Sequence, residues 1–484
     1  FSHWTKNGTI HNYSHIFIPQ DELNKQSKFS MFIYEALLIR KNLQLRIHNS
    51  IIKNIYKNKH KKNEYQEYVS LKNNSKHLTK EGLNKLEELE KNLYADLNIE
   101  IPTINIKDLQ ANINPNDVLI EFSEYTNIYN NDSLYSATIL KKDWKYPITL
   151  KMEINKNSSI ENNRLYNIVW EPLLKHLDFN SNIYFSAAGK LHQIPIESLP
   201  IRDGKIMSDA YNMYRLSSTR ELALKKEPAK YKKAVLYGGL NYNMTNEAML
   251  TENAKYQTDS TYTLFASRGL LEDSIRGYKW TNLNNTKMEV EYISEQMQQN
   301  GISTKVFQGN EGSEESFKAL SGKGYNIIHI ATHGFFFPEP EAKRKDYFQP
   351  IMLSDDLGRN YAPADLSLFR TGLVLSGGNR AWQGDSIPDH VEDGILTAHE
   401  IKDLDLRGAD LVVLSACNTG QGEITSEGIF GLQRAFKMAG AQTIIMSLTE
   451  VDDQTTMAMM NKLYSNLMEG QSKHDAFYNA QRYI

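Results

Sequence analysis

Two short apolar runs constrain the fold of this chain more than any other feature of its sequence. The run Leu411-Val-Val-Leu-Ser-Ala ends at Cys417, the single cysteine of 484 residues, and the run Tyr325-Asn-Ile-Ile-His-Ile-Ala-Thr ends at His333-Gly334. Neither run alternates apolar with polar residues, which is typical of strands buried on both faces of a parallel sheet. In open parallel sheets, functional side chains gather at the carboxyl ends of strands. We therefore predict that Cys417 and His333 meet at one edge of a sheet, as a nucleophile and its base.

Composition and charge bound the classes of protein to which the chain can belong. A length of 484 residues predicts two or three domains. The 55 Lys and Arg residues nearly balance the 58 Asp and Glu residues, and the net charge of −3 gives no electrostatic basis for binding nucleic acid. One cysteine excludes an internal disulfide and fits the reducing cytoplasm, where we expect the protein to be located.

The two ends of the chain and its hydropathy predict no membrane contact. No apolar run approaches the roughly 18 residues that a membrane helix needs, and the N-terminal residues have no secretory pattern. The chain begins with Phe1 rather than Met and stops at Ile484 within a predicted helix. We therefore expect it to be a portion of a longer protein.

Residues 1–103 are predicted to form a helical region, because they are rich in Lys, Asn and Tyr and almost free of Gly and Pro. No clean repeat of about 34 residues is evident in it. The basic stretch at residues 53–62 is either a phosphate-binding face or, as we favour, a solvated helix end. Two sets of apolar residues at spacings of three and four predict amphipathic helices: Phe32, Ala36, Ile39 and Leu43, then Leu83, Leu86, Leu89 and Leu93.

Residues 104–230 are predicted to form a first α/β region. Strands are predicted at 117–122, 135–140 and 148–152, separated by turns rich in Asn and Asp. A helix at 161–177 should be kinked or split by Pro172. His192 follows the next strand between two apolar residues and is predicted to be structural rather than catalytic.

Residues 231–484 are predicted to form a second α/β region with parallel crossovers. A long interval rich in Gly, Pro and Asp, residues 338–394, is predicted to be a functional loop broken by one strand at Gly372. The remaining elements are predicted as strands at 234–239, 303–307 and 443–448 and as helices at 286–299, 314–320, 397–402 and 427–438, with two more helices from 454 to 484.

A cysteine beside a histidine can perform acyl transfer, because the imidazole favours the nucleophilic thiolate. Gly334 allows a close backbone approach, and its N–H together with that of Cys417 is predicted to form an oxyanion hole. The alternative is that Cys417 is a small buried residue and His333 a core histidine with satisfied hydrogen bonds. Before any resemblance is considered, the two interpretations are about equally supported.

Metal binding is the main chemical competitor, and we expect neither a metal nor a cofactor. His329 and His333 have a ligand-like spacing only on a helix. On a strand their side chains lie roughly 13 Å apart, too far to share one ion. His399-Glu400 lacks the second histidine of a zinc protease helix.

Four motifs in order resemble the CHAT domain family of caspase-like and separase-like cysteine peptidases, which are often attached to tetratricopeptide helices. They are His-Ile-Ala-Thr-His333-Gly, Leu-Ser-Ala-Cys417-Asn-Thr-Gly, Glu427-Gly-Ile-Phe-Gly-Leu-Gln-Arg-Ala-Phe and Ala-Gly-Ala-Gln-Thr-Ile-Ile-Met-Ser-Leu448. The resemblance implies a caspase-like α/β/α sandwich with a mostly parallel sheet. It also implies that 104–230 is a non-catalytic first half and 231–484 the catalytic half, with His333 as base and Cys417 as nucleophile.

The resemblance also implies a preference for basic residues. In the family, an acidic residue in the stretch matching Ser447–Asp453 lines the pocket for the residue before the cleaved bond, which here indicates Asp453 and a Lys or Arg substrate residue. The alternative is that the Asp pair caps the following helix. Thr449 stands where the family usually has Trp, so the wall of the pocket should differ.

These features predict a cysteine endopeptidase that cuts a protein partner after a basic residue, acts in bacterial defence or signalling and is gated by an activating partner. Lys343-Arg-Lys345 in the long loop is a predicted self-cleavage site. One alternative is a catalytically silent adaptor that retains the peptidase fold. The other, rated lowest, is a nucleic-acid binder that uses residues 53–62.

Overall fold

The structure is a computed structural model, and its described residues divide into two compact units. Unit 1 takes in the described residues of Phe1–Arg46, Ile101–Glu227 and Ile424–Gly428, and unit 2 takes in those of Ile47–Glu100, Pro228–Glu423 and Ile429–Ile484. The described residues are 23–73, 80–94, 102–126, 133–152, 162–201, 204–224, 230–256, 279–337, 353–354, 360–361, 367–416, 419–420, 422–425, 428–448 and 451–484.

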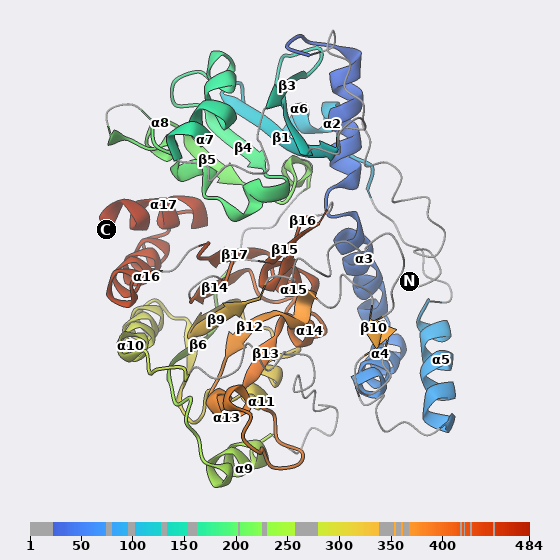
Figure 1. The fold of residues 1–484 in the computed structure, drawn as a ribbon, viewed down its shortest axis with the longest axis vertical. Helices are drawn as coiled ribbons and strands as arrows, with labels where there is room; N and C mark the ends of the chain where they lie inside the picture. Colours follow the sequence, from blue (N-terminus) through green and yellow to red (C-terminus); the bar gives the residue numbers. More distant parts are fainter. Residues whose placement is uncertain are drawn as a thin grey trace. The chain divides into compact units, whose positions relative to one another are not determined.

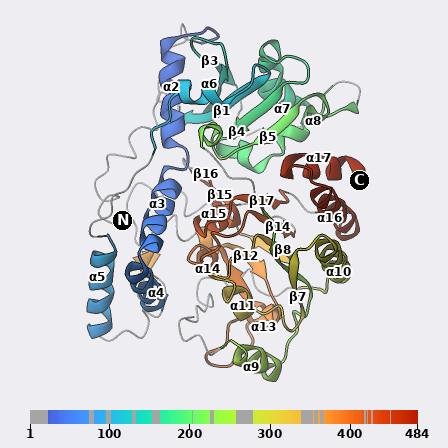
Figure 2. The same ribbon diagram turned by 180° about the vertical axis from the view of Figure 1, so that it is seen from behind.

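Unit 2 is built on a five-stranded sheet with the strand order β17-β14-β8-β6-β7. Figure 1 labels β17, β14 and β6 of this sheet, and Figure 2 labels β8 and β7. Each neighbouring pair of its strands is parallel. The strands are β6 (Lys233–Leu240), β7 (Ser303–Gly309), β8 (Ile327–Ala331), β14 (Leu411–Ser415) and β17 (Thr443–Met446). This sheet confirms the predicted mostly parallel α/β fold.

Helices cover both faces of the parallel sheet, which makes unit 2 an α/β/α sandwich. Val412 and Leu414 of β14 pack in one buried cluster with side chains of α11, α14 and α15. Leu411 and Val413 pack in a second buried cluster with side chains of α10 and α16. Figures 1 and 2 show α10 and α16 on one side of the strands and α14 and α15 on the other. Burial on both faces is the reason that this run does not alternate. The helices are α9 (Asn246–Ala254), α10 (Asn284–Gln299), α11 (Glu314–Lys318), α13 (Gly378–Gln383), α14 (Ala398–Ile401), α15 (Leu432–Met438), α16 (Asp453–Met468) and α17 (Lys473–Tyr483).

A small antiparallel sheet follows β8 and was not predicted from the sequence. Its order is β13-β12-β9, formed by β9 (His333–Phe336), β12 (Thr371–Val374) and β13 (Ile395–Thr397). The predicted strand at Gly372 is β12. Together with α13 it belongs to the interval 338–394, whereas β13 begins directly after that interval. A further short pair, β10 (Leu353–Ser354) with β11 (Asn360–Tyr361), lies within it, while Lys343-Arg-Lys345 lies outside the described residues.

The helix predicted at 427–438 is shorter than expected. Residues Gly428–Gly431 form β16, which pairs with β15 (Gly422–Thr425), and α15 begins only at Leu432. The two glycines of this segment explain the difference, because each lowers helix stability by about 1 kcal/mol relative to alanine.

Unit 1 contains a mixed sheet with the strand order β3-β2-β1-β4-β5. The strands are β1 (Asp117–Thr126), β2 (Ser133–Lys141), β3 (Ile148–Met152), β4 (Asn182–Ser186) and β5 (Asn212–Arg215). β1, β4 and β5 run parallel, while β2 and β3 are antiparallel neighbours. Pro172 splits the predicted helix at 161–177 as expected, because α7 (Asn162–Val169) ends before it and the 3₁₀ helix η4 (Glu171–His176) contains it.

The remaining elements of unit 1 surround this sheet. They are α2 (Lys28–Arg40), α6 (Ile106–Asn112), η5 (Gly189–Gln193), η6 (Ile196–Ser198), α8 (Met207–Ala210) and η8 (Thr219–Ala223). Burial lowers the pKa of His192 in η5 to about 3, so this histidine is neutral at physiological pH. Its backbone carbonyl accepts a hydrogen bond from the Arg215 side chain, a contact of a structural kind.

The apolar face predicted for the first helix is wrong by about one residue. α2 buries Ile33, Tyr34 and Leu37, whereas Phe32 and Ile39 are 63% and 51% exposed. The apolar residues of α2 surround the helix, so their spacing does not define a single face.

Three further helices are α3 (Leu43–Lys57), α4 (Lys59–Asn73) and α5 (Lys80–Tyr94). Leu89 and Leu93 of α5 are buried as predicted, while Leu83 is 47% exposed. Lys53, Lys57 and Lys59 are exposed, which fits a solvated helix end. Among all the helices that the structure describes, none is long and apolar enough to cross a membrane.

Candidate active site

The two strands that precede the predicted nucleophile and base lie side by side. β8 and β14 pair in parallel, and Ser415 lies opposite Ala331 at their carboxyl ends. His333 and Cys417 each follow two residues after these paired positions. Cys417 lies outside the described residues, so its contact with His333 stays a prediction.

The residues on both sides of position 417 are anchored to the end of β17. The Ala416 carbonyl accepts hydrogen bonds from the Ser447 hydroxyl and from the Thr419 hydroxyl at 3.2 Å. The Gly420 N–H donates to the Ser447 carbonyl at 2.7 Å. A Cβ atom at Gly420 would lie 2.9 Å from that same carbonyl oxygen, so this turn requires glycine. These bonds fix the backbone at both ends of the segment that carries Cys417.

The hydrogen bonding of His333 defines which ring nitrogen can act as a base. Its Nε2 lies 2.7 Å from the backbone carbonyl oxygen of Thr281. A carbonyl oxygen only accepts, so the neutral imidazole carries its proton on Nε2 and leaves Nδ1 unprotonated. Burial lowers the pKa of His333 below its ordinary value, against the opposing effects of the Thr281 carbonyl and the Asp453 carboxylate. The ring is therefore neutral at physiological pH, as a base must be.

Two aromatic rings flank the imidazole of His333. The ring centroids of Tyr242 and Trp280 lie 5.1 Å and 4.9 Å from that of His333. The Tyr242 hydroxyl shares a hydrogen bond of 3.0 Å with the Thr332 hydroxyl. Sequence reasoning missed this surround. The signal that could have indicated Tyr242 is that it follows β6 at the same edge of the sheet. No signal could have indicated Thr281, because it contributes a backbone carbonyl, which every residue type has.

The backbone of β9 presents the Gly334 N–H away from its partner strand. Phe337 donates its N–H to the Arg370 carbonyl at 2.8 Å, and Gly334 lies opposite Leu373. Antiparallel pairs alternate between bonded and non-bonded positions, so Gly334 falls at a non-bonded one. Among the strands that the structure describes, β9 is the last in the order β13-β12-β9, and the Gly334 N–H points away from β12. The role of the Gly334 N–H in an oxyanion hole stays a prediction, because Cys417 lies outside the described residues.

The two aspartates at the start of α16 have different roles. Asp452 is the N-cap, and its carboxylate accepts from the Thr455 N–H at 2.8 Å. Asp453 lies in the first helical turn, partly buried, where its Oδ2 accepts from the Asn285 N–H at 3.4 Å. Burial raises the pKa of Asp453, and its charge in turn raises the pKa of His333. The capping alternative thus applies to Asp452, while Asp453 lies within electrostatic reach of His333.

The other histidine of the β8 motif is a core residue. His329 is fully buried, with Nε2 2.9 Å from the Glu289 carboxylate and Nδ1 3.2 Å from the Tyr464 hydroxyl. Both ring nitrogens therefore have protein partners. These two partners belong to the helical layer of α10 and α16.

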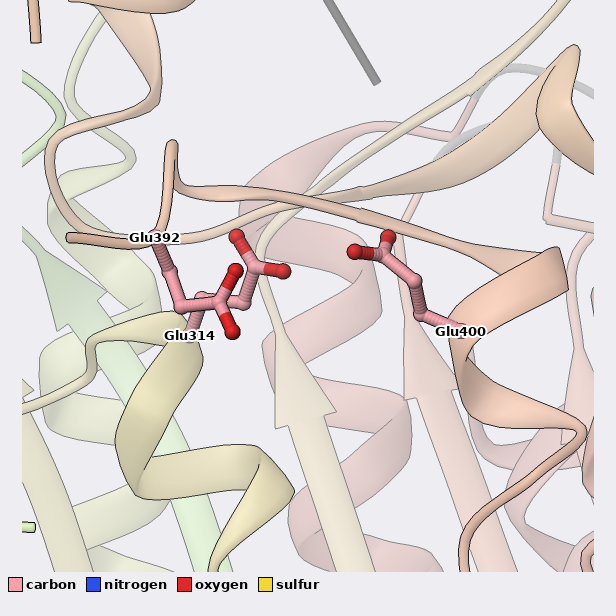
Figure 3. A group of neighbouring side chains, drawn as sticks. All are labelled: Glu314, Glu392 and Glu400. Atoms are coloured by element: carbon pink, nitrogen blue, oxygen red, sulfur yellow. The ribbon is translucent and has the colours of Figure 1, made fainter. Parts of the chain in front are cut away.

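Three buried glutamates form the one cluster of metal-ligand type among the described residues, drawn in Figure 3. Glu314, Glu392 and Glu400 point their carboxylates at a common centre. The Lys318 ammonium occupies that centre, 2.7 Å, 2.8 Å and 3.1 Å from their oxygens. An ammonium with three donors already supplies the cation that these carboxylates need, so the residues fit an ion-pair network and not a metal site.

Comparisons with known proteins identify the family of the chain. The family model of the CHAT domain matches residues 160–484. Human Tetratricopeptide repeat protein 28 is 32% identical over 106 residues, which are 22% of this chain and 4% of that protein. Its mouse counterpart is 37% identical over 76 residues, 16% of this chain and 3% of that protein. The matches thus span a small part of these long relatives. The family match covers most of the chain, which therefore belongs to the CHAT domain family and has its caspase-like peptidase fold.

Proposed function

We propose that this protein is a cysteine endopeptidase with a Cys417–His333 dyad that cleaves a protein partner after a basic residue. The observation that carries the proposal is the state of His333. It follows the strand paired with β14, is buried enough to be neutral, and is held by the Thr281 carbonyl with Nδ1 free to accept a proton.

The proposed reaction proceeds through a thioester. Nδ1 of His333 takes the proton of the Cys417 thiol, and the sulfur attacks the carbonyl carbon of the scissile peptide bond. The N–H groups of Gly334 and Cys417 stabilise the oxyanion. The C–N bond then breaks as the imidazolium returns its proton to the leaving amine, and water hydrolyses the thioester by the same route.

The location of Asp453 supports a preference for Lys or Arg before the cleaved bond. Replacing Asp453 with Asn should lower kcat/KM for an arginine peptide by about 10- to 100-fold, since a charge-assisted hydrogen bond contributes about 1.5–3 kcal/mol. Turnover of a matched methionine peptide should change far less. The two kcat/KM values, measured side by side, check this.

Asp452→Asn is the matched control for Asp453→Asn. It removes the same charge from the adjacent residue, and asparagine caps helices as well as aspartate does. Retained arginine preference in Asp453→Asn, or equal loss in both variants, would remove Asp453 from the pocket.

The cellular role is also a proposal. A single cysteine and the balanced charge support action in the cytoplasm, with a protein substrate and without a nucleic acid or membrane partner. The resemblance supports a role in bacterial defence or signalling, in which an activating partner acts on the peptidase through the helical region.

Labelling of Cys417 tests the proposal against a silent adaptor. An arginyl peptide chloromethyl ketone should modify the chain once, at Cys417, far faster than it modifies a free thiol, and intact-mass spectrometry would report the single addition. Cys417→Ala should show no addition. Reaction with this reagent and with iodoacetamide at the rates of an ordinary thiol would favour the adaptor.

A further inference from the structure

Asn379 in α13 is fully buried and pairs with the main chain of the segment that contacts His333. Its Oδ1 accepts from the Trp280 N–H at 2.8 Å, and its Nδ2 donates to the Trp280 carbonyl at 2.9 Å. The amide therefore binds both polar groups of one residue. Trp280 packs on the His333 ring, and the next residue, Thr281, supplies the carbonyl that binds Nε2.

Asn379 also binds the segment that contains Tyr242, the second aromatic residue that packs on the imidazole. The Asn379 N–H donates to the Tyr242 carbonyl at 3.1 Å, and its Nδ2 donates a second time, to the Asn243 side-chain oxygen at 2.9 Å. Gly377, two residues earlier, donates its N–H to the Asn241 carbonyl at 3.0 Å. α13 thus connects the segment after β6 with the segment before α10.

We propose that Asn379 is a positioning residue that sets the orientation and tautomer of His333. It does not contact the imidazole itself. It fixes Trp280 and Tyr242, whose rings both pack against the imidazole, and through Trp280 it fixes the Thr281 carbonyl at hydrogen-bonding distance. This inference rests on the proposed function, because orientation of His333 matters only if that ring acts as the base.

The chemistry of the site requires an amide at this position. Each neighbour of the side chain demands a defined donor or acceptor: two oxygens need donors, and one N–H needs an acceptor. Aspartate has the same size but supplies no donor. It would place a carboxylate against the Trp280 carbonyl, which should push the segment away.

Asn379→Ala and Asn379→Asp should lower kcat by about 30- to 100-fold with KM changed less than twofold, because a displacement of about 1 Å at the base can have this effect. Ring-¹⁵N spectroscopy should show His333 protonated at Nε2 alone in the wild type and a mixture of tautomers in both variants. Comparison with His333→Gln assigns the signal among the 13 histidines.

The matched control is Asn466→Ala. Asn466 is as buried as Asn379, and its Nδ2 likewise donates to a backbone carbonyl, that of Ala476 at 3.0 Å. Asn466 belongs to α16, however, and this bond joins α16 to α17. Asn466→Ala should lower the melting temperature without altering kcat or the tautomer of His333. Asn379→Asp, which keeps the volume and the acceptor for Trp280, separates positioning from a loss of packing.

The outcomes distinguish this inference from the proposed function. An unchanged Nε2–H tautomer in both Asn379 variants, or equal loss of kcat in Asn466→Ala, would overturn it. A further outcome is that the wild type cleaves no peptide while the His333 tautomer still differs from that of the wild type only in the Asn379 variants. In that case the peptidase proposal fails and the positioning role stands.

Discussion

Replacing His333 with Gln should lower kcat/KM for an arginine peptide by about 10³-fold, since general base catalysis contributes about 10²–10⁴-fold. The glutamine amide can still donate to the Thr281 carbonyl, so the fold should be kept while the proton acceptor is lost. The rate of Cys417 alkylation at neutral pH should fall in parallel, because the thiolate loses its base. Steady-state kinetics and timed iodoacetamide labelling measure the two effects.

The pH profile gives a second measure of the same role. Burial lowers the pKa of His333 from 6.5, so the neutral imidazole persists below that value. The acid limb of kcat/KM should therefore lie below pH 6.5 in the wild type, with activity lost as pH falls through it, and should be absent from His333→Gln. His60→Gln, at an exposed position of α4, is the control and should leave both the rate and the profile unchanged. An acid limb that survives in His333→Gln would identify another group as the base.

The placement of the two strand ends was predictable because burial imposes a sequence pattern. A strand covered on both faces must be apolar throughout, so the runs before His333 and Cys417 predicted adjacent parallel strands. The resemblance added the order of the motifs. The geometry between Cys417 and His333 remains a prediction, since Cys417 lies outside the described residues, as does Thr449.

The groups around His333 could not be predicted, because they leave no pattern in the sequence. Thr281 acts through its carbonyl, which every residue possesses. Asn379 comes from an interval whose glycines indicated a loop, and only tertiary pairing shows that its amide faces Trp280. The three glutamates around Lys318 come from α11, from α14 and from the segment before β13. Of the three ion pairs, only that of Glu314 with Lys318 could be predicted from the sequence, because these two residues are four positions apart on one helix.

The contacts of Lys318 connect α11 to the small sheet that includes β9. Besides its pairing with Lys318, Glu314 accepts from the Gly394 N–H at 2.9 Å, and Glu315 accepts from the Glu392 N–H at 3.1 Å. The segment 392–394 leads directly into β13, which pairs with β12 and through it with β9. The network therefore holds the layer on which His333 lies.

Replacing Lys318 with Met should lower the free energy of unfolding of unit 2 by about 3–5 kcal/mol, the range for removing one partner from a buried ion pair. Burial alone would lower the pKa of Lys318, but three carboxylates outweigh it and raise that pKa well above its usual value, so the ammonium is always charged. Lys85→Met, which breaks an exposed pair with Glu67, should have almost no effect. Urea unfolding, with hydrogen exchange at the Gly394 amide, provides the measurement.

The loss caused by Lys318→Met should grow as pH rises. Burial raises the pKa of Glu392 to about 8, so the folded protein holds a proton that the unfolded chain releases near 4.5. A carboxyl with a raised folded-state pKa stabilises the fold at low pH and loses that contribution as pH rises through about 8. The charge of Lys318 lowers the pKa of Glu314 and of Glu392, so both pKa values should rise further when Lys318 is removed. A carboxyl that keeps its proton in the fold adds about 1.4 kcal/mol of destabilisation per pH unit above the pKa that it has in the unfolded chain. Adding Glu392→Gln to Lys318→Met should recover part of the stability at pH 8, because one fewer carboxylate then needs a proton. A difference between wild type and Lys318→Met that stays constant from pH 5 to 8 would show that the three carboxylates do not act as one charged network.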